Sequence, residues 1–279
     1  MTQPLVTVII PAFNYARYIE QCISSVLQQT YPRIETIVVD DGSTDNTADV
    51  IKKFGDKIRI VRQANSGVSV ARNTGLLNSS GEYVAFLDAD DWWEPIKVET
   101  QIAKMLIMQA GISYGFYYSE HDSGKTMEFT FPQVNELVKN QYLRSPLTSL
   151  IPLPCSNAII KREIIGNNLF NTKLSNSADW EYFARISRGV LVVCVPVALT
   201  HYRIHPNSMS RRKLRSYYFH ACLSFFAFLR HIGILKLDFF DTALGLFSLI
   251  KSMLKDLLKY ILCSLKSPDI QDHNERENI

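Results

Sequence analysis

Residues 84 to 92 combine an apolar run with a cluster of carboxylates. The four apolar residues at 84 to 87 predict a strand that is buried on both faces. Three aspartates follow within four positions, Asp88, Asp90 and Asp91. Such crowding is unfavourable unless a cation lies there, and carboxylate oxygens suit Mg²⁺ or Mn²⁺. The alternative is an acidic turn that caps a helix starting near Pro95.

Similar polar groups follow other predicted strands. Residues 11–14 follow the first strand, and Asp40 and Asp41 follow the second. Residues 71–75 come after the turn that follows the third strand. If the sheet is parallel, these strand ends share the edge where α/β sheets bind ligands. A base-reading carboxylate, a phosphate-facing arginine and a metal carboxylate would then converge, as a nucleotide-diphosphate donor requires. No GxGxxG or GxxxxGK[ST] motif is present, which argues against dinucleotide and P-loop binding.

The elements that would position these groups alternate between strand and helix. Hydrophobic periodicity and turn residues predict strands at residues 5–10, 35–39, 57–61 and 82–87, the first one stopped by Pro11. They predict helices at 15–29, 46–54, 68–77 and 94–108. This alternation predicts an α/β fold, a three-layer sandwich with a mainly parallel central sheet.

The second half of the chain has a weaker pattern. Strands are predicted at residues 112–118, 126–131, 155–160 and 190–199, and a helix at 179–187. Residues 132–153 have no clear periodicity. The fold of this half is therefore less determined by local sequence than that of the first.

Composition describes a globular protein of one large domain, alone or with an appendage. The chain has 279 residues, of which 47% are hydrophobic and 20% charged. A formal net charge of +3 is too small to argue for a nucleic-acid partner. The five cysteines are scattered and form no CxxC pair, so neither a zinc site nor a disulfide framework is indicated. This pattern favours a reducing cytoplasmic location. The first residues lack the features of a signal peptide.

The polar segments together resemble the family 2 inverting glycosyltransferases, which have the GT-A fold. Four motifs occur in the order of that family, at residues 6–14, 38–45, 71–75 and 88–91. Two later segments, 178–181 and 202–210, resemble its general-base motif and its closing histidine motif. The resemblance covers residues 5 to 210, and it implies a GT-A domain at 1–210, with a donor half at about 1–110 and an acceptor half at 111–210.

The resemblance implies a donor site in the first half. Pro11 and Phe13 would form the wall of the base pocket, and Asp41 would accept a hydrogen bond from the base. Arg72 would lie beside the base or the phosphates, and Asp88 would open the DxD motif. A plainer interpretation of Arg72 is a surface residue of its helix.

The resemblance also implies a metal and a general base. Asp90 would be the metal ligand of the DxD motif, and His205 a further contact to the metal or the diphosphate. Asp179 would be the catalytic base, although the family's usual preceding glutamate is Ala178 here. The plainer interpretations are a helix cap for Asp179 and a structural turn residue for His205.

The function implied is an inverting, metal-dependent glycosyltransferase that moves a sugar from a nucleotide-diphosphate donor to an acceptor hydroxyl. The acceptor would be a surface polysaccharide or a lipid-linked glycan. A first rival is a nucleotidyltransferase, but residues 11–14 are not the glycine-rich basic loop that it needs. A second rival is a non-catalytic nucleotide-sugar binding protein at the membrane, and the retention of Asp90 and Asp179 argues against it.

Residues 211–266 form a predicted helical appendage of different composition. They contain ten lysines or arginines and three aspartates, a net charge of +7. Between 246 and 265, Lys251, Lys255 and Lys259 share one helical face opposite a leucine-rich face. No apolar run reaches the length of a membrane-spanning helix. The helix would either lie peripherally on the inner face of the membrane or pack on the domain or a second subunit. Residues 267–279 are predicted to be a frayed polar tail.

Overall fold

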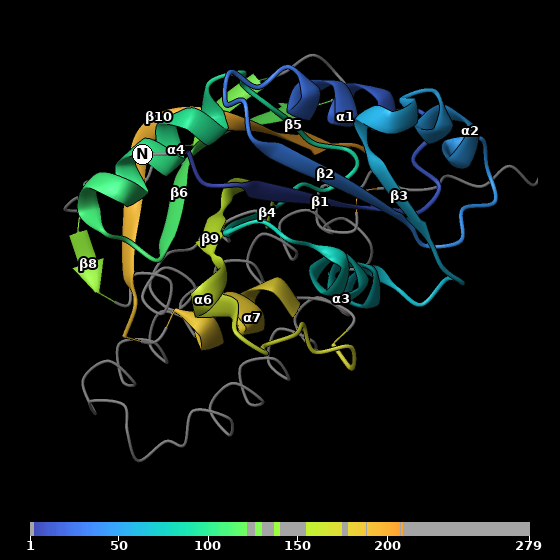
Figure 1. The fold of residues 1–279 in the computed structure, drawn as a ribbon. Coiled ribbons are helices and arrows are strands. Elements are labelled where there is room, and N and C mark those ends of the chain that lie inside the picture. Colours follow the sequence, from blue (N-terminus) through green and yellow to red (C-terminus); the bar gives the residue numbers. More distant parts are fainter. Residues whose placement is uncertain are drawn as a thin grey trace, which may run out of the picture.

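The computed structural model describes residues 3–121, 126–129, 137–139, 155–174, 178–187, 189–206 and 208. Within these ranges one large sheet carries helices on both faces (Figure 1). This arrangement confirms the predicted three-layer α/β sandwich. The predicted appendage at 211–266 and the tail at 267–279 lie outside the described residues.

The first half of the chain forms the parallel part of the sheet. The strands lie in the order β3-β2-β1-β4 and span Val6–Ala12 (β1), Ile34–Asp40 (β2), Arg59–Arg62 (β3) and Tyr83–Phe86 (β4). Their connections contain three α-helices, Ile19–Leu27 (α1), Thr47–Lys52 (α2) and Val68–Asn78 (α3). The predicted alternation of strand and helix is therefore correct. The third strand begins later than predicted, because residues Gly55–Lys57 form a 3₁₀ turn, η1.

Pro11 does not stop the first strand, which corrects the prediction. β1 continues to Ala12, and Pro11 pairs with Val39 of β2. A proline inside a sheet normally removes a ladder hydrogen bond. Here the last pair between β1 and β4 is Ile9 with Phe86. Pro11 therefore lies where β4 has already left the ladder, and its missing N–H costs no pairing on that side.

The second half extends the sheet. The order continues as β9-β6-β10-β5, with strands Ile159–Lys161 (β9), Ile112–His121 (β6), Leu191–Ile204 (β10) and Trp92–Trp93 (β5). Two short strands, Thr126–Phe129 (β7) and Leu137–Lys139 (β8), pair with β6 and β10. β9 runs antiparallel to both β4 and β6, so β6 and β10 run in the direction of β4. The C-terminal ends of β1, β2, β4, β6 and β10 therefore lie at the same edge.

Several boundaries in this half differ from the prediction. The predicted strand at 155–160 is a 3₁₀ turn, Cys155–Asn157 (η2), followed by β9. β5 occupies the position just before the helix predicted from residue 94, so helix α4 begins later and spans Lys97–Met108. β10 passes its predicted end at 199 and carries the closing histidine motif to the sheet edge.

The helices divide between the two faces of the sheet. Helices α1, α2 and α4 cover one face, and α3, α6 (Arg162–Ile165) and α7 (Ala178–Ile186) cover the other (Figure 1). Each face has its own buried apolar cluster. Helix α3 lies very close to β1, because a Cβ atom at Gly75 would be 2.3 Å from Cγ2 of Ile9. Gly75 thereby fixes α3, and with it Arg72, against the strand that leads into the cleft described below.

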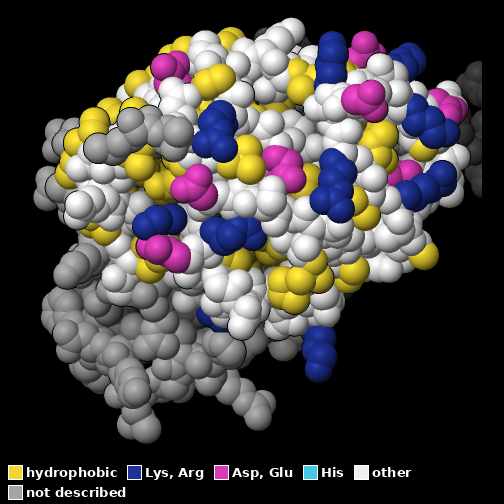
Figure 2. Space-filling view, in the orientation of Figure 1, with side chains coloured by type: hydrophobic (Ala, Val, Ile, Leu, Met, Phe, Trp, Pro, Cys, Tyr) yellow, Lys and Arg dark blue, Asp and Glu magenta, His cyan; other side chains and the backbone are white. Residues whose placement is uncertain are grey.

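The outer surface shown in Figure 2 has mixed charge. Lysine and arginine side chains alternate there with aspartate and glutamate, and hydrophobic side chains are scattered between them. No helix within the described residues is long and apolar enough to cross a membrane.

Candidate active site

A cleft of about 660 Å³ opens at the edge where β1, β2 and β4 end. Seven predicted site residues line it, namely Pro11, Phe13, Asp41, Arg72, Asp88, Asp90 and His205. The eighth, Asp179, is half-buried in the first turn of α7 and is not among the lining residues. Its negative charge nevertheless acts on Arg72. The structure thus brings together groups that are up to 194 positions apart in the chain.

Asp41 anchors the loop between β3 and α3. Its Oδ1 accepts hydrogen bonds from Gln63 Nε2 (2.7 Å) and from the Ser66 N–H (2.9 Å), and its Oδ2 accepts one from the Gly67 N–H (2.8 Å). Gly67 has a φ of 91°, which favours glycine at this turn. A carboxylate offers about four acceptor positions, so one remains for a ligand. This anchoring function was not evident from the sequence.

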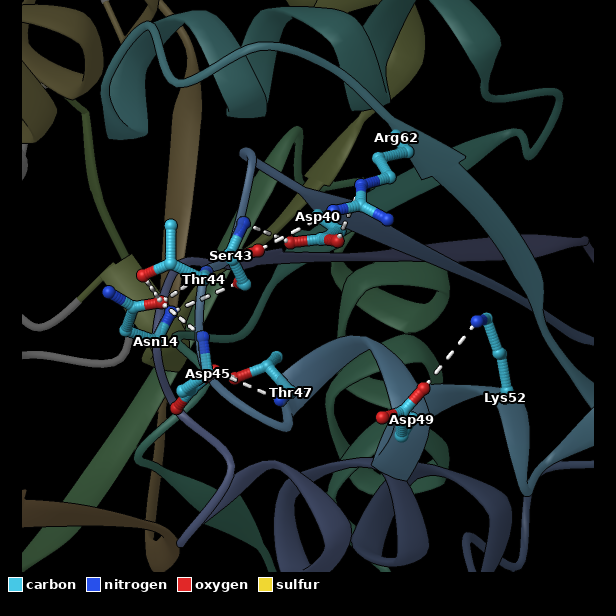
Figure 3. A network of polar contacts seen from close by, with 9 residues as sticks. All are labelled: Asn14, Asp40, Ser43, Thr44, Asp45, Thr47, Asp49, Lys52 and Arg62. Atoms are coloured by element: carbon cyan, nitrogen blue, oxygen red, sulfur yellow. Dashed lines mark hydrogen bonds and ion pairs between the residues drawn. The ribbon is translucent and has the colours of Figure 1, made fainter.

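Asn14 joins the loops that follow β1 and β2. It has a φ of 59°, a left-handed conformation that asparagine tolerates. Its Oδ1 accepts hydrogen bonds from the backbone N–H groups of Thr44 (2.8 Å) and Asp45 (3.3 Å) (Figure 3). Asp45 in turn accepts a bond from the N–H of Thr47, the first residue of α2 (2.9 Å). Asn14 and Asp45 therefore hold the turn that leads into α2.

The contacts of Asp40 indicate a structural function. Its Oδ1 accepts a hydrogen bond from the Ser43 N–H (2.9 Å), and its Oδ2 lies 3.4 Å from Nε of Arg62 (Figure 3). The side chain is buried and does not line the cleft. Asp40 therefore shapes the turn after β2, while its neighbour Asp41 faces the cleft.

Arg72 and Asp88 form a close ion pair in the floor of the cleft. Nη2 of Arg72 lies 2.6 Å from Oδ1 of Asp88, and the guanidinium also lies over the ring of Phe170 at 5.4 Å. Burial by itself lowers the pKa of Arg72, but the negative charges of Asp88 and Asp179 raise it, and the net shift is upward. Arg72 is 6% exposed and its Nε has no hydrogen-bond partner among the described residues. It is thus a fixed positive charge, not a surface helix residue.

Asp90 and His205, which both line the cleft, contact each other. His205 Nε2 lies 3.0 Å from Oδ2 of Asp90. Burial, and then the charge of Asp88, raise the pKa of Asp90, while the hydrogen bond from His205 lowers it. Asp90 is thus a buried carboxylate with a second carboxylate, Asp88, nearby. A cation would relieve the repulsion between them, so the chemistry of this donor set fits a divalent metal.

The described residues contain no group of three or more His, Cys, Asp or Glu side chains arranged to hold a metal ion. Asp90 and His205 would therefore offer a metal two side chains, not a closed cage. Mg²⁺ is typically bound in that way, through one or two carboxylates together with substrate phosphates and water.

The third carboxylate, Asp91, connects neighbouring segments and does not line the cleft. Its Oδ2 accepts a hydrogen bond from the Ser156 hydroxyl (2.5 Å), and its Oδ1 accepts one from the Arg203 N–H (3.0 Å). The Ser156 hydroxyl also accepts a bond from the Asp88 N–H (3.1 Å). Burial, and then the charges of Asp90 and Asp88, raise the pKa of Asp91 well above its usual value. Asp91 therefore ties η2 and β10 to the acidic strand end.

A mainly parallel sheet whose polar strand ends surround a cleft is the arrangement of the GT-A glycosyltransferases. The sequence motifs agree with that class. The chain belongs to glycosyl transferase family 2, whose family model matches residues 7–168.

Several bacterial relatives support this assignment. The chain is 31% identical to the putative teichuronic acid biosynthesis glycosyltransferase TuaG of Bacillus subtilis, over 77% of this chain and 84% of the relative. It is 34% identical to UDP-Glc:alpha-D-GlcNAc-diphosphoundecaprenol beta-1,3-glucosyltransferase WfaP of Escherichia coli, over 76% and 82%. A 46% identical match to the glycosyltransferase GlyA of Streptococcus pneumoniae covers 42% of this chain but only 17% of that longer protein.

Two solved structures have the same fold. One is S. aureus TarS 1-349 in complex with UDP-GlcNAc, with a TM-score of 0.70 and 20% identity, over 90% of this chain and 73% of that one. The other is the mannosyltransferase PcManGT from Pyrobaculum calidifontis in complex with GDP-Man and Mn²⁺, with a TM-score of 0.62 and 19% identity, over 96% and 82%.

Proposed function

We propose that this chain is an inverting, metal-dependent glycosyltransferase that moves a sugar from a nucleotide-diphosphate donor to an acceptor hydroxyl in surface polysaccharide or lipid-linked glycan synthesis. The observation that carries the proposal is the single cleft in which Arg72, Asp88, Asp90 and His205 lie together with Phe13 and Asp41. The names of TuaG and WfaP support the acceptor class.

The nucleotide base would bind at the Phe13 and Asp41 end. Phe13 is 40% exposed, so an apolar ring faces solvent at the cleft although burial would be favourable. Pro11 lies beside it on the end of β1. Asp41, with one acceptor position left, would take a hydrogen bond from a base N–H. A stacked and hydrogen-bonded base would orient the diphosphate toward Arg72.

Asp90 and His205 would hold the metal, Mn²⁺ or Mg²⁺. When bound, the metal supplies positive charge that neutralises the leaving diphosphate. Arg72 adds a second positive charge, and its ion pair with Asp88 holds the guanidinium in place. Preorganised charges of this kind stabilise the developing negative charge on the leaving group.

Asp179 would act as the general base. Its carboxylate takes the proton of the acceptor hydroxyl while that oxygen bonds to the anomeric carbon. The bond from the anomeric carbon to the diphosphate oxygen breaks, and its electron pair leaves with the diphosphate. One such displacement inverts the anomeric centre. The electrostatic influence of Asp179 on Arg72 supports its placement near the donor.

A donor panel tests the proposal. The purified chain is incubated with Mn²⁺ and UDP-, GDP- or dTDP-sugars, with and without a diphosphate-linked lipid acceptor, and the released products are identified. The proposal predicts release of nucleoside diphosphate from one donor class, faster with acceptor. Release of pyrophosphate would instead indicate a nucleotidyltransferase. Donor binding without any turnover would indicate a non-catalytic binding protein.

The proposal extends to a peripheral membrane contact by residues 211–266, on the inner face where a lipid-linked acceptor would be met. The net charge of +7 in that segment supports it, since anionic lipid attracts each nearby basic residue by about 1 kcal/mol. Co-sedimentation with anionic vesicles tests this contact. Charge reversal at Lys251, Lys255 and Lys259 should weaken it, whereas failure of the unaltered chain to co-sediment would contradict it.

A further inference from the structure

Arg203 lies on β10, two residues before His205, and contacts two segments of the first half. Its Nε donates a hydrogen bond to the backbone carbonyl of Asp90 (2.9 Å), and its Nη2 donates one to Oε1 of Gln21 on α1 (2.6 Å). Its own backbone N–H donates to Oδ1 of Asp91 (3.0 Å). The side chain therefore joins the end of β10 to α1 and to the acidic strand end.

The guanidinium group of Arg203 also contacts aromatic rings. Its guanidinium carbon lies 4.8 Å from the ring centre of Tyr18 and 4.5 Å from that of Trp92. The Tyr18 ring is itself 4.8 Å from the His205 ring, and Trp92 stacks on His201 at 4.6 Å. These contacts form a continuous series of rings and cations that ends at His205. Cation–π contacts of this type favour arginine over lysine, because the guanidinium is flat.

We propose that Arg203 is a positioning residue that sets the separation and orientation of Asp90 and His205. It holds Asp90 by the backbone and orients His205 through Tyr18. Arg203 does not line the cleft, so direct contact with the donor is not its function. The inference rests on the proposed function, in which Asp90 and His205 hold the metal.

The test compares Arg203→Met and Arg203→Lys with the unaltered chain. The matched control is Arg59→Met, which removes an arginine that bonds Asn78 (2.8 Å) away from the cleft. Affinity for UDP, GDP and dTDP is measured by calorimetry, in Mn²⁺ and in EDTA, beside a thermal melt. We expect Arg203→Met to lose about 10- to 100-fold of the Mn²⁺-dependent affinity, the range for outer partners of metal ligands. Affinity in EDTA should stay unchanged.

The lysine variant separates charge from geometry. Since lysine keeps the charge but lacks the flat face and the Nε donor, we expect it to resemble Arg203→Met; full recovery by lysine would overturn the positioning role. A lowered melting temperature with unchanged Mn²⁺-dependent affinity would likewise overturn it, because Arg203 would then only stabilise the fold. If the unaltered chain gains no affinity from Mn²⁺, the metal site of the proposed function is wrong, and this inference falls with it.

Discussion

Two regions of the molecule meet at one cleft. The first region consists of the ends of β1, β2 and β4, and the second consists of the end of β10 and the turn η2 that supports it. The two regions hold their functional groups in different ways. In the first region the polar groups stand within a few positions of their strands, as Asp41 does after β2. In the second region Arg203 and His205 depend on Gln21 and Asp90, which are 182 and 115 positions away in the chain. The groups of the first region can be identified from local sequence, whereas the contacts of the second arise only from tertiary packing.

Asp90→Asn tests the first region and should have the largest effect. We expect turnover to fall about a thousandfold or more, since the metal's charge stabilisation is worth several kcal/mol. Because burial and Asp88 raise the pKa of Asp90, its ionised form is unfavourable in the folded protein, and the melting temperature should stay the same or rise at neutral pH. Asp49→Asn, at an exposed carboxylate on α2, is the control. Full activity at ordinary Mn²⁺ concentration would contradict the metal assignment.

Asp179→Asn tests whether the second half of the chain contributes to catalysis as well as to structural support. The change is nearly isosteric, so donor binding should survive. Transfer to the acceptor should fall about a hundredfold or more, on the scale of general-base loss. Separate measurements of donor affinity and transfer rate distinguish the two effects. If the transfer rate is unaltered, Asp179 is only a residue of the first turn of α7.

Asn157→Ala tests the second region's dependence on packing, and its effect should appear in stability. The Asn157 amide donates to the Gly115 carbonyl (2.5 Å), and its oxygen accepts from the Gly115 N–H (3.2 Å) and the Thr200 hydroxyl (3.3 Å). Each buried backbone group left without a partner costs about 1–3 kcal/mol. We therefore expect the free energy of unfolding to fall by about 2–4 kcal/mol in urea titration. Asn78→Ala, at a half-buried site on α3, should cost less. An equal loss at both sites would remove the contrast between the regions.

Lys97→Met should have the smallest effect on activity, and its effect on stability should depend on pH. Lys97 is fully buried between Trp93, Gln101 and Asn157, and burial lowers its pKa well below the usual value. The folded state therefore releases this proton at lower pH than the unfolded state does. Stability should rise with pH from the lowered folded pKa up to the unfolded value near 10.4, by at most about 1.4 kcal/mol per pH unit. Urea midpoints at several pH values should show this slope in the unaltered chain and a smaller slope in Lys97→Met. Identical slopes would contradict a buried, neutralised lysine.

The sequence predicted the first region well, because its evidence is local. A buried strand followed by Asp88 and Asp90 shows both where the sheet ends and where charge accumulates. The same holds for Asp41 and for the segment with Arg72 and Gly75, although the contact of Gly75 with Ile9 became visible only in the fold.

The second region could not be predicted in the same way. Nothing near Ser156 in the sequence indicates that its hydroxyl bridges Asp88 and Asp91, and a 3₁₀ turn replaced the strand expected there. Likewise, the polar motif around His205 drew attention to the histidine, while Arg203 gains its contacts from segments that only the fold brings near. Local propensity has no information about such partners.

Crystals of the chain grown with Mn²⁺ and the nucleoside diphosphate that it binds would test the central claim most directly, through the anomalous scattering of manganese. The account predicts one manganese peak bound directly by both the Asp90 carboxylate and the His205 imidazole, in place of their present 3.0 Å contact, with diphosphate oxygens beside it. A diphosphate bound elsewhere, or bound in this cleft with the Asp90–His205 contact intact and no manganese between them, would contradict it.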